Sequence, residues 1–483
     1  MVNSSQEAPN LKSWQLIAEN KFEVGKEDLL QSLRADFHEE PSEEGARKRC
    51  QSKWDEFVKE TRIKFGTILK ADTVSVLLGA GASKHLGGVL LGSIPLSIEQ
   101  KLLETGIRGV RVSRWLRLFY TAAQRIATDK GSVPTDRSSI LERRNALSVN
   151  PPPEELNVNL ETLLSVLYGW RATLSFGASR MRLDGDPSVD ASSDDVEGAI
   201  QHIKAGLVEK CILPDGGNSA SNPLRTHREL LKKLLTRPLN LKRVNIFTLN
   251  YDTLIEKAAD AEGIVVFDGF VGTLSRVFRP ESYDQDLYFP AETTEGRVHR
   301  FDRVVHLYKL HGSISWQPTD PDLDNPYGIF STEAGARPSN SALIYPTPLK
   351  QTQALGMPYA ELFRMLAATV VRPQSVLLVI GYGFGDEHVV SIFRQALAVP
   401  SFRLIVVDPR PRSGFIAQLR SQNDQRVWIV SGPRLATFEG FVDELLPDLR
   451  EEEMLKKVMD TWRALSRTNV GQQTQGPEED DGK

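Results

Sequence analysis

The chain has 483 residues, of which 40% are hydrophobic and 25% are charged, an ordinary composition for a globular protein. Its net charge of −4 excludes a global electrostatic attraction to nucleic acid or to an anionic membrane surface. The two cysteines, Cys50 and Cys211, are too few for a disulfide framework or a cysteine zinc site, and no apolar run approaches the ~20 residues that span a bilayer. We therefore expect a cytoplasmic protein that binds neither membrane nor nucleic acid directly.

Extensions are predicted at both ends of the chain. Residues 1–70 are predicted to form an N-terminal helical extension, because 44–69 carries apolar side chains roughly at helical spacing. The opening residues lack an apolar run, so no secretory signal is expected there. Helices are expected over 431–467, followed by a disordered tail over 468–483 that is rich in polar and acidic residues.

Short aliphatic runs predict the strands of one domain over 71–430. Each run ends in small or polar residues, and helices follow several of them. This alternation is typical of a doubly wound, parallel, Rossmann-like α/β sheet with its ligand site at the carboxyl ends of the strands. The segments are TVSVLLGAGAS (73–83), RVNIFTLNYDTLIE (243–256), VVHLYKLHGSISW (304–316), SVLLVIGYGFGDEHV (375–389) and FRLIVVDPRP (402–411).

A helical module is predicted to be inserted into this domain over about 105–240. Apolar residues repeat at helical spacing over 111–127, 160–174 and 224–235, and turn-rich segments separate these stretches. The stretch that follows the second strand segment, as far as about 300, is expected to be irregular.

The first strand runs into Gly79-Ala80-Gly81-Ala82-Ser83. Glycines allow a tight turn and let the backbone approach a diphosphate without a Cβ clash. The N-terminus of a following helix would direct N–H groups at the phosphates, and Ser83 could add a hydroxyl donor. Because the motif is neither a full GxGxxG nor a Walker loop, an ordinary strand–helix turn is the alternative.

Two further strand ends carry candidate reactive side chains. The amide of Asn250 can donate and accept hydrogen bonds, so it could bind a ribose hydroxyl or orient a water molecule. Asp252 could contact a ribose or cap the helix that begins near Thr253. His311, followed by Gly312, is one of only eight histidines and is a natural general base at neutral pH. The alternatives are that Asn250 and Asp252 only turn the chain and that His311 is structural.

The last two strand segments end in a glycine loop and in an aspartate. Gly381 and Gly383, with Gly385, suggest a close backbone approach or positive φ angles, and Asp386 is interpreted as the cap of the next helix. Asp408 ends its strand where dinucleotide folds place a carboxylate on ribose hydroxyls. A solvated turn is the alternative for Asp408.

In this order, the motifs GAGAS, TLNYD, KLHGS, GYGFGDEH and VVD resemble those of the sirtuin family. Sirtuins carry a GAG loop, a strand-end asparagine with an aspartate two residues on, and a catalytic histidine in an HG pair. The segments TLNYDTLIE, KLHGS and IGYGFGDEH are more closely similar to the sirtuin-like domains of bacterial antiphage defence proteins, which hydrolyse NAD. The resemblance covers roughly residues 73–420.

The resemblance implies a role for each motif. Asn250 and His311 would be the catalytic pair of an NAD hydrolase (NADase) that releases ADP-ribose and nicotinamide in antiviral defence. It also implies a regulated enzyme that forms a homo-oligomer, with a HerA-type ATPase or a short Argonaute as candidate partners. The residues that would bind the cofactor, NAD, which is also the substrate, are Gly79, Ala80, Gly81, Ser83, Asp252, Gly381, Gly383 and Asp408.

Two departures from the protein-deacylating sirtuins favour NAD cleavage. Those enzymes usually carry four zinc cysteines, which this chain cannot supply, so no zinc is expected. Its asparagine motif also reads TLNYD instead of the usual TQN form. The alternatives are a deacylase, a non-catalytic sensor of NAD or of an ADP-ribose-like signal, and a hydride-transfer dehydrogenase. Arg410 and Arg412 lie near Asp408 and leave NADP open beside NAD.

Overall fold

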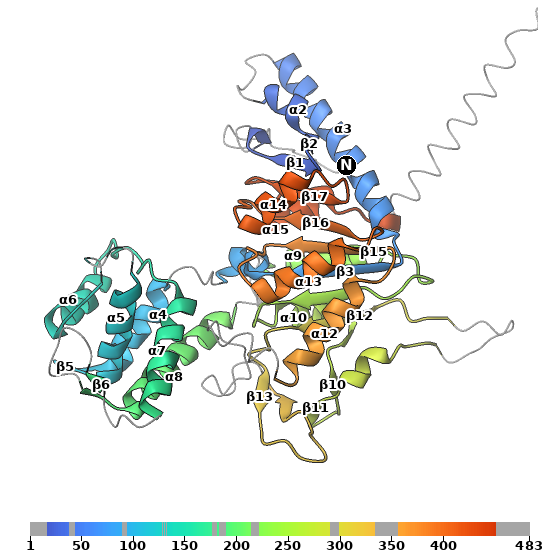
Figure 1. Ribbon diagram of the computed structural model, residues 1–483. Helices are drawn as coiled ribbons and strands as arrows, with labels where there is room; N and C mark the ends of the chain where they lie inside the picture. The colour runs from blue at the N-terminus through green and yellow to red at the C-terminus, as the bar shows by residue number, and fades with distance from the viewer. Residues whose placement is uncertain are drawn as a thin grey trace, which may run out of the picture.

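The computed structural model describes residues 17–37, 44–88, 94–127, 129, 131, 133–175, 181–182, 190–213, 222–289, 299–333 and 356–450. Its centre is a nine-stranded sheet in the order β2-β1-β17-β16-β15-β3-β8-β12-β9, with helices on both faces (Figure 1). Seven neighbouring strands run parallel: β3 (Thr73–Leu78), β8 (Asn245–Thr248), β9 (Val265–Phe267), β12 (Val304–Lys309), β15 (Ser375–Ile380), β16 (Arg403–Val407) and β17 (Val427–Ser431). The doubly wound, Rossmann-like α/β class is confirmed.

Alternation along the central strands divides the core between the two faces of the sheet. In β15, Leu378 and Ile380 pack into one hydrophobic cluster, whereas Leu377 and Val379 pack into another. Every residue of β3 and β15 is buried, as expected for parallel strands covered on both faces. The helices on one face are α3 (Glu44–Leu69), α9 (Arg225–Leu234) and α10 (Leu254–Glu262), and those on the other are α12 (Tyr359–Val370), α13 (Glu387–Leu397) and α14 (Gly414–Gln422).

The N-terminal extension is not purely helical, which corrects the prediction for residues 1–70. The strands β1 (Lys21–Val24) and β2 (Glu27–Asp28) precede α2 (Gln31–Ala35) and extend the main sheet, with β1 antiparallel to β17. The sheet is therefore mixed at this edge. Only Phe22 of β1 is fully buried, stacked on Phe65 of α3, and a single buried residue in four gives too little alternation to predict a strand.

The helical module lies beside the sheet (Figure 1) and has its own hydrophobic core. It begins and ends earlier than the predicted 105–240. The helix α9 (Arg225–Leu234), predicted as part of the module, packs against α10 on the main sheet instead, since its buried leucines belong to the core of the sheet. The module comprises α4 (Leu96–Gly106), β4 (Ile107–Arg108), β5 (Arg111–Val112), α5 (Arg114–Ile126), α6 (Arg137–Leu147), α7 (Leu160–Ser175), β6 (Met181–Arg182), β7 (Asp190–Ala191) and α8 (Ser193–Cys211).

The stretch expected to be irregular contains parts of a second, small sheet. Its strands β10 (Phe270–Val271), β11 (Arg276–Phe278), β14 (Ile329–Ser331) and β13 (Trp316–Pro318) pair in that order. They have two or three residues each, too few for an alternating pattern to be visible in the sequence. The described chain ends after α15 (Phe438–Gly440) and a π-helical turn over Phe441–Leu445. The predicted helices beyond 450 and the tail lie outside the described residues.

Candidate functional site

The chain reverses its direction across the sheet at the boundary between β3 and β15. From β3 it proceeds to β8 on one side, and it returns later to β15 and β16 on the other. In open α/β sheets, ligands bind in the crevice at the carboxyl ends of such neighbouring strands. A cavity of about 470 Å³ lies here. It is lined by Gly79, Ala80, Ser83, Gly88, Asn159, Leu207, Lys210, Cys211, Leu213, Leu249, Asn250, Tyr251, Asp252, His311, Gly381, Tyr382, Gly383, Gly385 and Asp386.

The loops after β3 and β15 cross in direct backbone contact. The N–H of Gly81 donates to the carbonyl oxygen of Gly381 at 2.9 Å, and a Cβ on Gly81 would lie 2.6 Å from the Cα of Gly381. Gly381 has a φ of +66°, which fits the predicted need for glycine. A Cβ on Gly383 or on Gly385 would meet no atom within 4 Å, and the other residue of this loop with a left-handed backbone is Phe384. The expected close approach or positive φ angle is therefore found only at Gly381.

Gly381→Ala is expected to destabilise the fold by about 3 kcal/mol or more, because a side chain there adds left-handed backbone strain and overpacks the crossing. Urea unfolding measures the change in the free energy of unfolding. Gly383→Ala is the matched control, since a Cβ at that position meets no atom within 4 Å, and its stability should stay close to that of the wild type. Equal free energies of unfolding for the two variants would contradict the close backbone contact between Gly81 and Gly381.

The GAGAS loop does not lead into an α-helix, which corrects the expectation of a helix N-terminus aimed at phosphates. It continues as a 3-10 helix, η1 (Ala80–Leu86). The N–H groups of Gly79, Gly81 and Ala82 donate to the backbone oxygens of Ile380, Gly381 and Gly79 at 2.9–3.0 Å. These three donors are therefore already used within the fold.

Asn250, Ser83 and Asp252 form a chain of side-chain hydrogen bonds. Asn250 Nδ2 donates to the backbone oxygen of Gly79 and to Ser83 Oγ, both at 3.0 Å, and Ser83 Oγ donates to Asp252 Oδ2 at 2.6 Å. Asp252 Oδ1 accepts from the N–H of Leu254 at the start of α10. The carboxamide of Asn250 is thus held through its nitrogen, and its oxygen Oδ1 takes part in none of these bonds.

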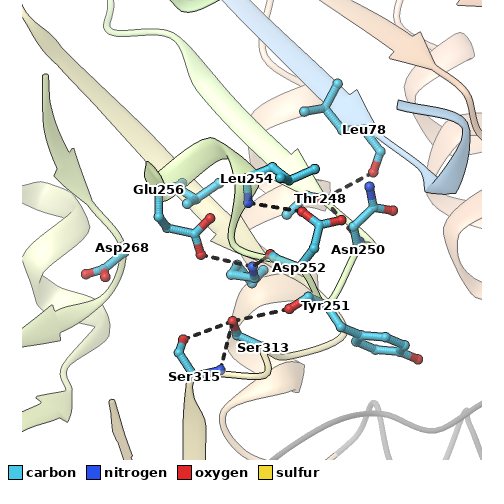
Figure 2. A network of polar contacts seen from close by, with 12 residues as sticks. Leu78, Thr248, Asn250, Tyr251, Asp252, Leu254, Glu256, Asp268, Ser313 and Ser315 are labelled. Carbon is cyan, nitrogen blue, oxygen red and sulfur yellow. Dashed lines mark hydrogen bonds and ion pairs between the residues drawn. The ribbon is translucent and has the colours of Figure 1, made fainter. Parts of the chain in front are cut away.

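The loop that carries Asn250 is fixed from both neighbouring strands (Figure 2). Thr248 Oγ1 donates to the backbone oxygen of Leu78 on β3 and accepts from the N–H of Asn250. On the other side, Ser313 Oγ donates to the backbone oxygen of Tyr251 at 3.5 Å, a long contact. The loop therefore has little freedom to reorient the carboxamide.

A buried lysine also anchors this loop. Lys309 ends β12, and its side chain is only 2% exposed. Its Nζ donates to the backbone oxygen of Asp252 and pairs with Glu256 Oε1 at 2.9 Å. Because a buried ammonium needs such partners, the lysine of the KLHGS motif serves to position the Asp252 loop.

His311 follows β12 and faces a carboxylate from the glycine loop. Its Nε2 lies 3.3 Å from Asp386 Oδ2, and both side chains are buried. The other oxygen of Asp386, Oδ1, accepts from the N–H of His388 and caps α13, as predicted from the sequence. One carboxylate therefore both caps a helix and lies beside the imidazole.

The helical module supplies one wall of the cavity. Leu207, Lys210 and Cys211 come from the end of α8. In return, Tyr251 and Ile314 from the strand-end loops pack into the hydrophobic core of the module. Burial raises the pKa of the Cys211 thiol to about 12, so at neutral pH the group is a protonated thiol and not a nucleophilic thiolate.

The structure brings together most of the predicted site residues. Gly81 packs at the crossing and does not line the cavity. Asp408 does not line it either: its Oδ1 accepts from the N–H of Arg410 in the turn after β16, and burial raises its pKa. The predicted ligand contacts of Gly81 and Asp408 stay predictions, and so do the predicted roles of the residues that line the cavity. The predicted residues that line the cavity are Gly79, Ala80, Ser83, Asn250, Asp252, His311, Gly381 and Gly383.

Other residues of the site were missed in the sequence or predicted only as structural. Asp386 was predicted only as a helix cap, because its contact with His311 joins two loops that are far apart in the chain. Lys210 and Cys211 lie at the end of a helix whose docking position has no sequence signal. Asn159 lines the cavity and directly precedes the stretch 160–174, whose apolar spacing predicted only a helix. The leucines of that stretch are buried in the core of the module.

A larger cavity, of about 780 Å³, lies at the opposite edge of the sheet, near the start of β8. None of the motif residues lines it. Several of its charges are already paired, as in the contact of Asp286 with Arg243 and Arg300. The smaller cavity, which the motif residues and the crossing line, is therefore the candidate functional site.

The site lies where the chain reverses its direction across the sheet, between β3 and β15. It combines the crossed glycine loops, the held carboxamide of Asn250 and the pair of His311 with Asp386. This arrangement is typical of an α/β domain that binds a ligand at the carboxyl ends of its strands. Residues 244–428 match the family model of the SIR2-like domain, which confirms the resemblance to sirtuins. This segment of the chain is thus similar to a SIR2-like domain, and SIR2-like domains bind NAD. The matched segment includes Asn250, Asp252, His311 and Asp386, whereas β3 and its GAGAS loop precede it.

No curated protein matches the chain. Within the ranges that the structure describes, no group of three or more His, Cys, Asp or Glu residues could hold a metal ion. Over the same ranges, no helix combines the length and the apolar character needed to cross a membrane.

Proposed function

We propose that the protein hydrolyses NAD in this cavity, cleaving the bond between nicotinamide and ribose. The observation that carries the proposal is the convergence of the Asn250 carboxamide and the His311–Asp386 pair on one cavity of a SIR2-like domain. Its volume of about 470 Å³ lies within the usual range for small-molecule sites.

The chemistry of this bond suits a small set of side chains. Nicotinamide in NAD is a cationic leaving group that departs neutral with the bonding electron pair, so no general acid is needed. The ribose becomes oxocarbenium-like, and a water molecule forms the new C–O bond and loses one proton. A positioned hydrogen-bond acceptor and one base are sufficient to orient and deprotonate that water.

Asn250 and His311 fit these two tasks. The nitrogen of the Asn250 carboxamide is held by Gly79 and Ser83, so Oδ1 is oriented in advance and can accept from the water or from a ribose hydroxyl. His311 accepts the proton, and the carboxylate of Asp386 stabilises the imidazolium that forms. The overall products are ADP-ribose, nicotinamide and one proton.

Product analysis tests the proposal. Purified protein is incubated with NAD, and nicotinamide and ADP-ribose are followed by chromatography, with and without an acylated peptide. Equal release of both products without peptide supports the hydrolase. Release of O-acyl-ADP-ribose only with peptide would establish a deacylase, and tight binding of NAD that stays intact would favour a sensor.

Asp386→Asn is expected to lower the rate of NAD cleavage by about tenfold, which corresponds to about 1.4 kcal/mol of lost charge stabilisation in the transition state. The neutral amide no longer stabilises a protonated His311, so the acid limb of the pH–rate profile should move toward lower pH. Asn still caps helices, so α13 should persist. A lower rate with an unchanged pH profile would reduce Asp386 to a structural role.

We also propose that the activity is restrained until infection and then depletes NAD. The proposal rests on the resemblance to antiphage proteins and on the cost of an unregulated NADase to the cell. A homo-oligomer, or a HerA-type ATPase or short Argonaute partner, would supply the control. Bacteria that express the wild type, but not His311→Ala, should lose NAD and form fewer plaques after phage challenge. Equal plaque counts for the two strains across a phage panel would contradict the defence role.

A further inference from the structure

A diphosphate in this cavity faces an electrostatic problem. The cavity is lined by two carboxylates, Asp252 and Asp386, and the diphosphate of NAD would add two more negative charges. In Rossmann-type folds, N–H groups of the glycine loop and of a helix N-terminus offset such charge. Here three N–H groups of the GAGAS loop are bonded to backbone oxygens, and no α-helix follows the loop.

Lys210 is the one lysine or arginine among the described residues that line the cavity. It lies in the last turn of α8, is half-buried, and forms no ion pair with any residue that the structure describes.

Other charged residues of α8 have partners away from the cavity. Glu209 pairs with Lys101 of α4, and Lys204 lies over the ring of Tyr168 in the core of the module. Neither Glu209 nor Lys204 lines the cavity. Lys210 therefore differs from Glu209 and Lys204 because its side chain lines the cavity and forms no ion pair with a described residue.

We propose that Lys210 binds the diphosphate group of NAD and of ADP-ribose. This inference rests on the proposed function and deepens it by assigning the diphosphate subsite to a residue of the helical module. A compact ammonium suits a phosphate as a point charge and balances the two carboxylates of the cavity. Binding then requires both the glycine loop of the sheet and the end of α8.

Isothermal titration of the full chain with ADP-ribose tests the proposal. Lys210→Met keeps the aliphatic length and removes the charge, and should weaken binding about 10- to 100-fold, as expected for the loss of a charge-assisted hydrogen bond. Lys210→Arg keeps the charge and should stay within about threefold of the wild type. Lys204→Met is the matched control on the same helix and should bind as the wild type does.

Salt dependence separates a direct charge contact from a general disturbance. The affinity of the wild type for ADP-ribose should fall with added salt, and that of Lys210→Met should fall less steeply. Unweakened binding by Lys210→Met would overturn the inference, as would an arginine variant as weak as the methionine variant. If the wild type binds neither ADP-ribose nor NAD, the proposed function itself fails, and the assignment of Lys210 fails with it.

Discussion

His311→Ala is expected to abolish the release of nicotinamide and ADP-ribose, with a rate loss of about 10²- to 10⁴-fold, the usual contribution of a positioned general base. His311 lies at the carboxyl end of β12, lines the cavity and faces Asp386. Alanine leaves no group there to accept the proton of the attacking water. The rate is measured by chromatography of products in single-turnover conditions.

Two controls make the histidine result interpretable. His299→Ala removes an exposed histidine that does not line the cavity and should retain the wild-type rate. The affinity of His311→Ala for NAD should stay within a few fold of the wild type, because the proposed base acts on water. A folded His311→Ala variant with near-normal turnover would remove His311 from the mechanism.

Asn250→Ala is expected to reduce turnover by at least about 10²-fold, comparable to the loss of one preorganised polar group at a reacting centre. The substitution removes the oriented Oδ1 and both hydrogen bonds to the GAGAS loop. Because those bonds also hold the loop, thermal unfolding must be measured beside the rate.

Asn250→Asp separates positioning from chemistry. It has the same shape but lacks the two N–H donors, so the bonds to Gly79 and Ser83 are lost while an oxygen acceptor is kept. We expect it to be impaired as well, since the orientation of the acceptor is lost. Full activity of folded Asn250→Ala and His311→Ala would together defeat the assigned catalytic pair.

The sheet and most of the cavity could be predicted from the sequence for one physical reason. Parallel strands buried on both faces are continuous aliphatic runs, as in TVSVLL of β3 and SVLLVI of β15. Since their carboxyl ends share one edge, polar residues that follow adjacent strands such as β8 and β12 lie near one another. The sequence therefore predicts that Asn250 and His311 lie at the same edge of the sheet.

The rest depends on contacts between parts of the chain that no local pattern links. The pairing of His311 with Asp386 joins loops after β12 and β15, and Lys210 reaches the cavity only because α8 docks beside Tyr251. The hydrogen bonds that occupy the GAGAS loop likewise come from Gly381 and Ile380. Edge strands such as β1 are too short to show a period.

The crossing of Gly81 and Gly381 has a consequence for how the protein is made. The two residues are 300 positions apart, the difference between their numbers in the chain. At about 5–20 residues per second, a ribosome needs roughly 15–60 seconds to deliver the second loop after the first. Throughout that interval the nascent chain lacks one side of the cavity, so the ligand site is complete only in copies extended past the Gly381 loop.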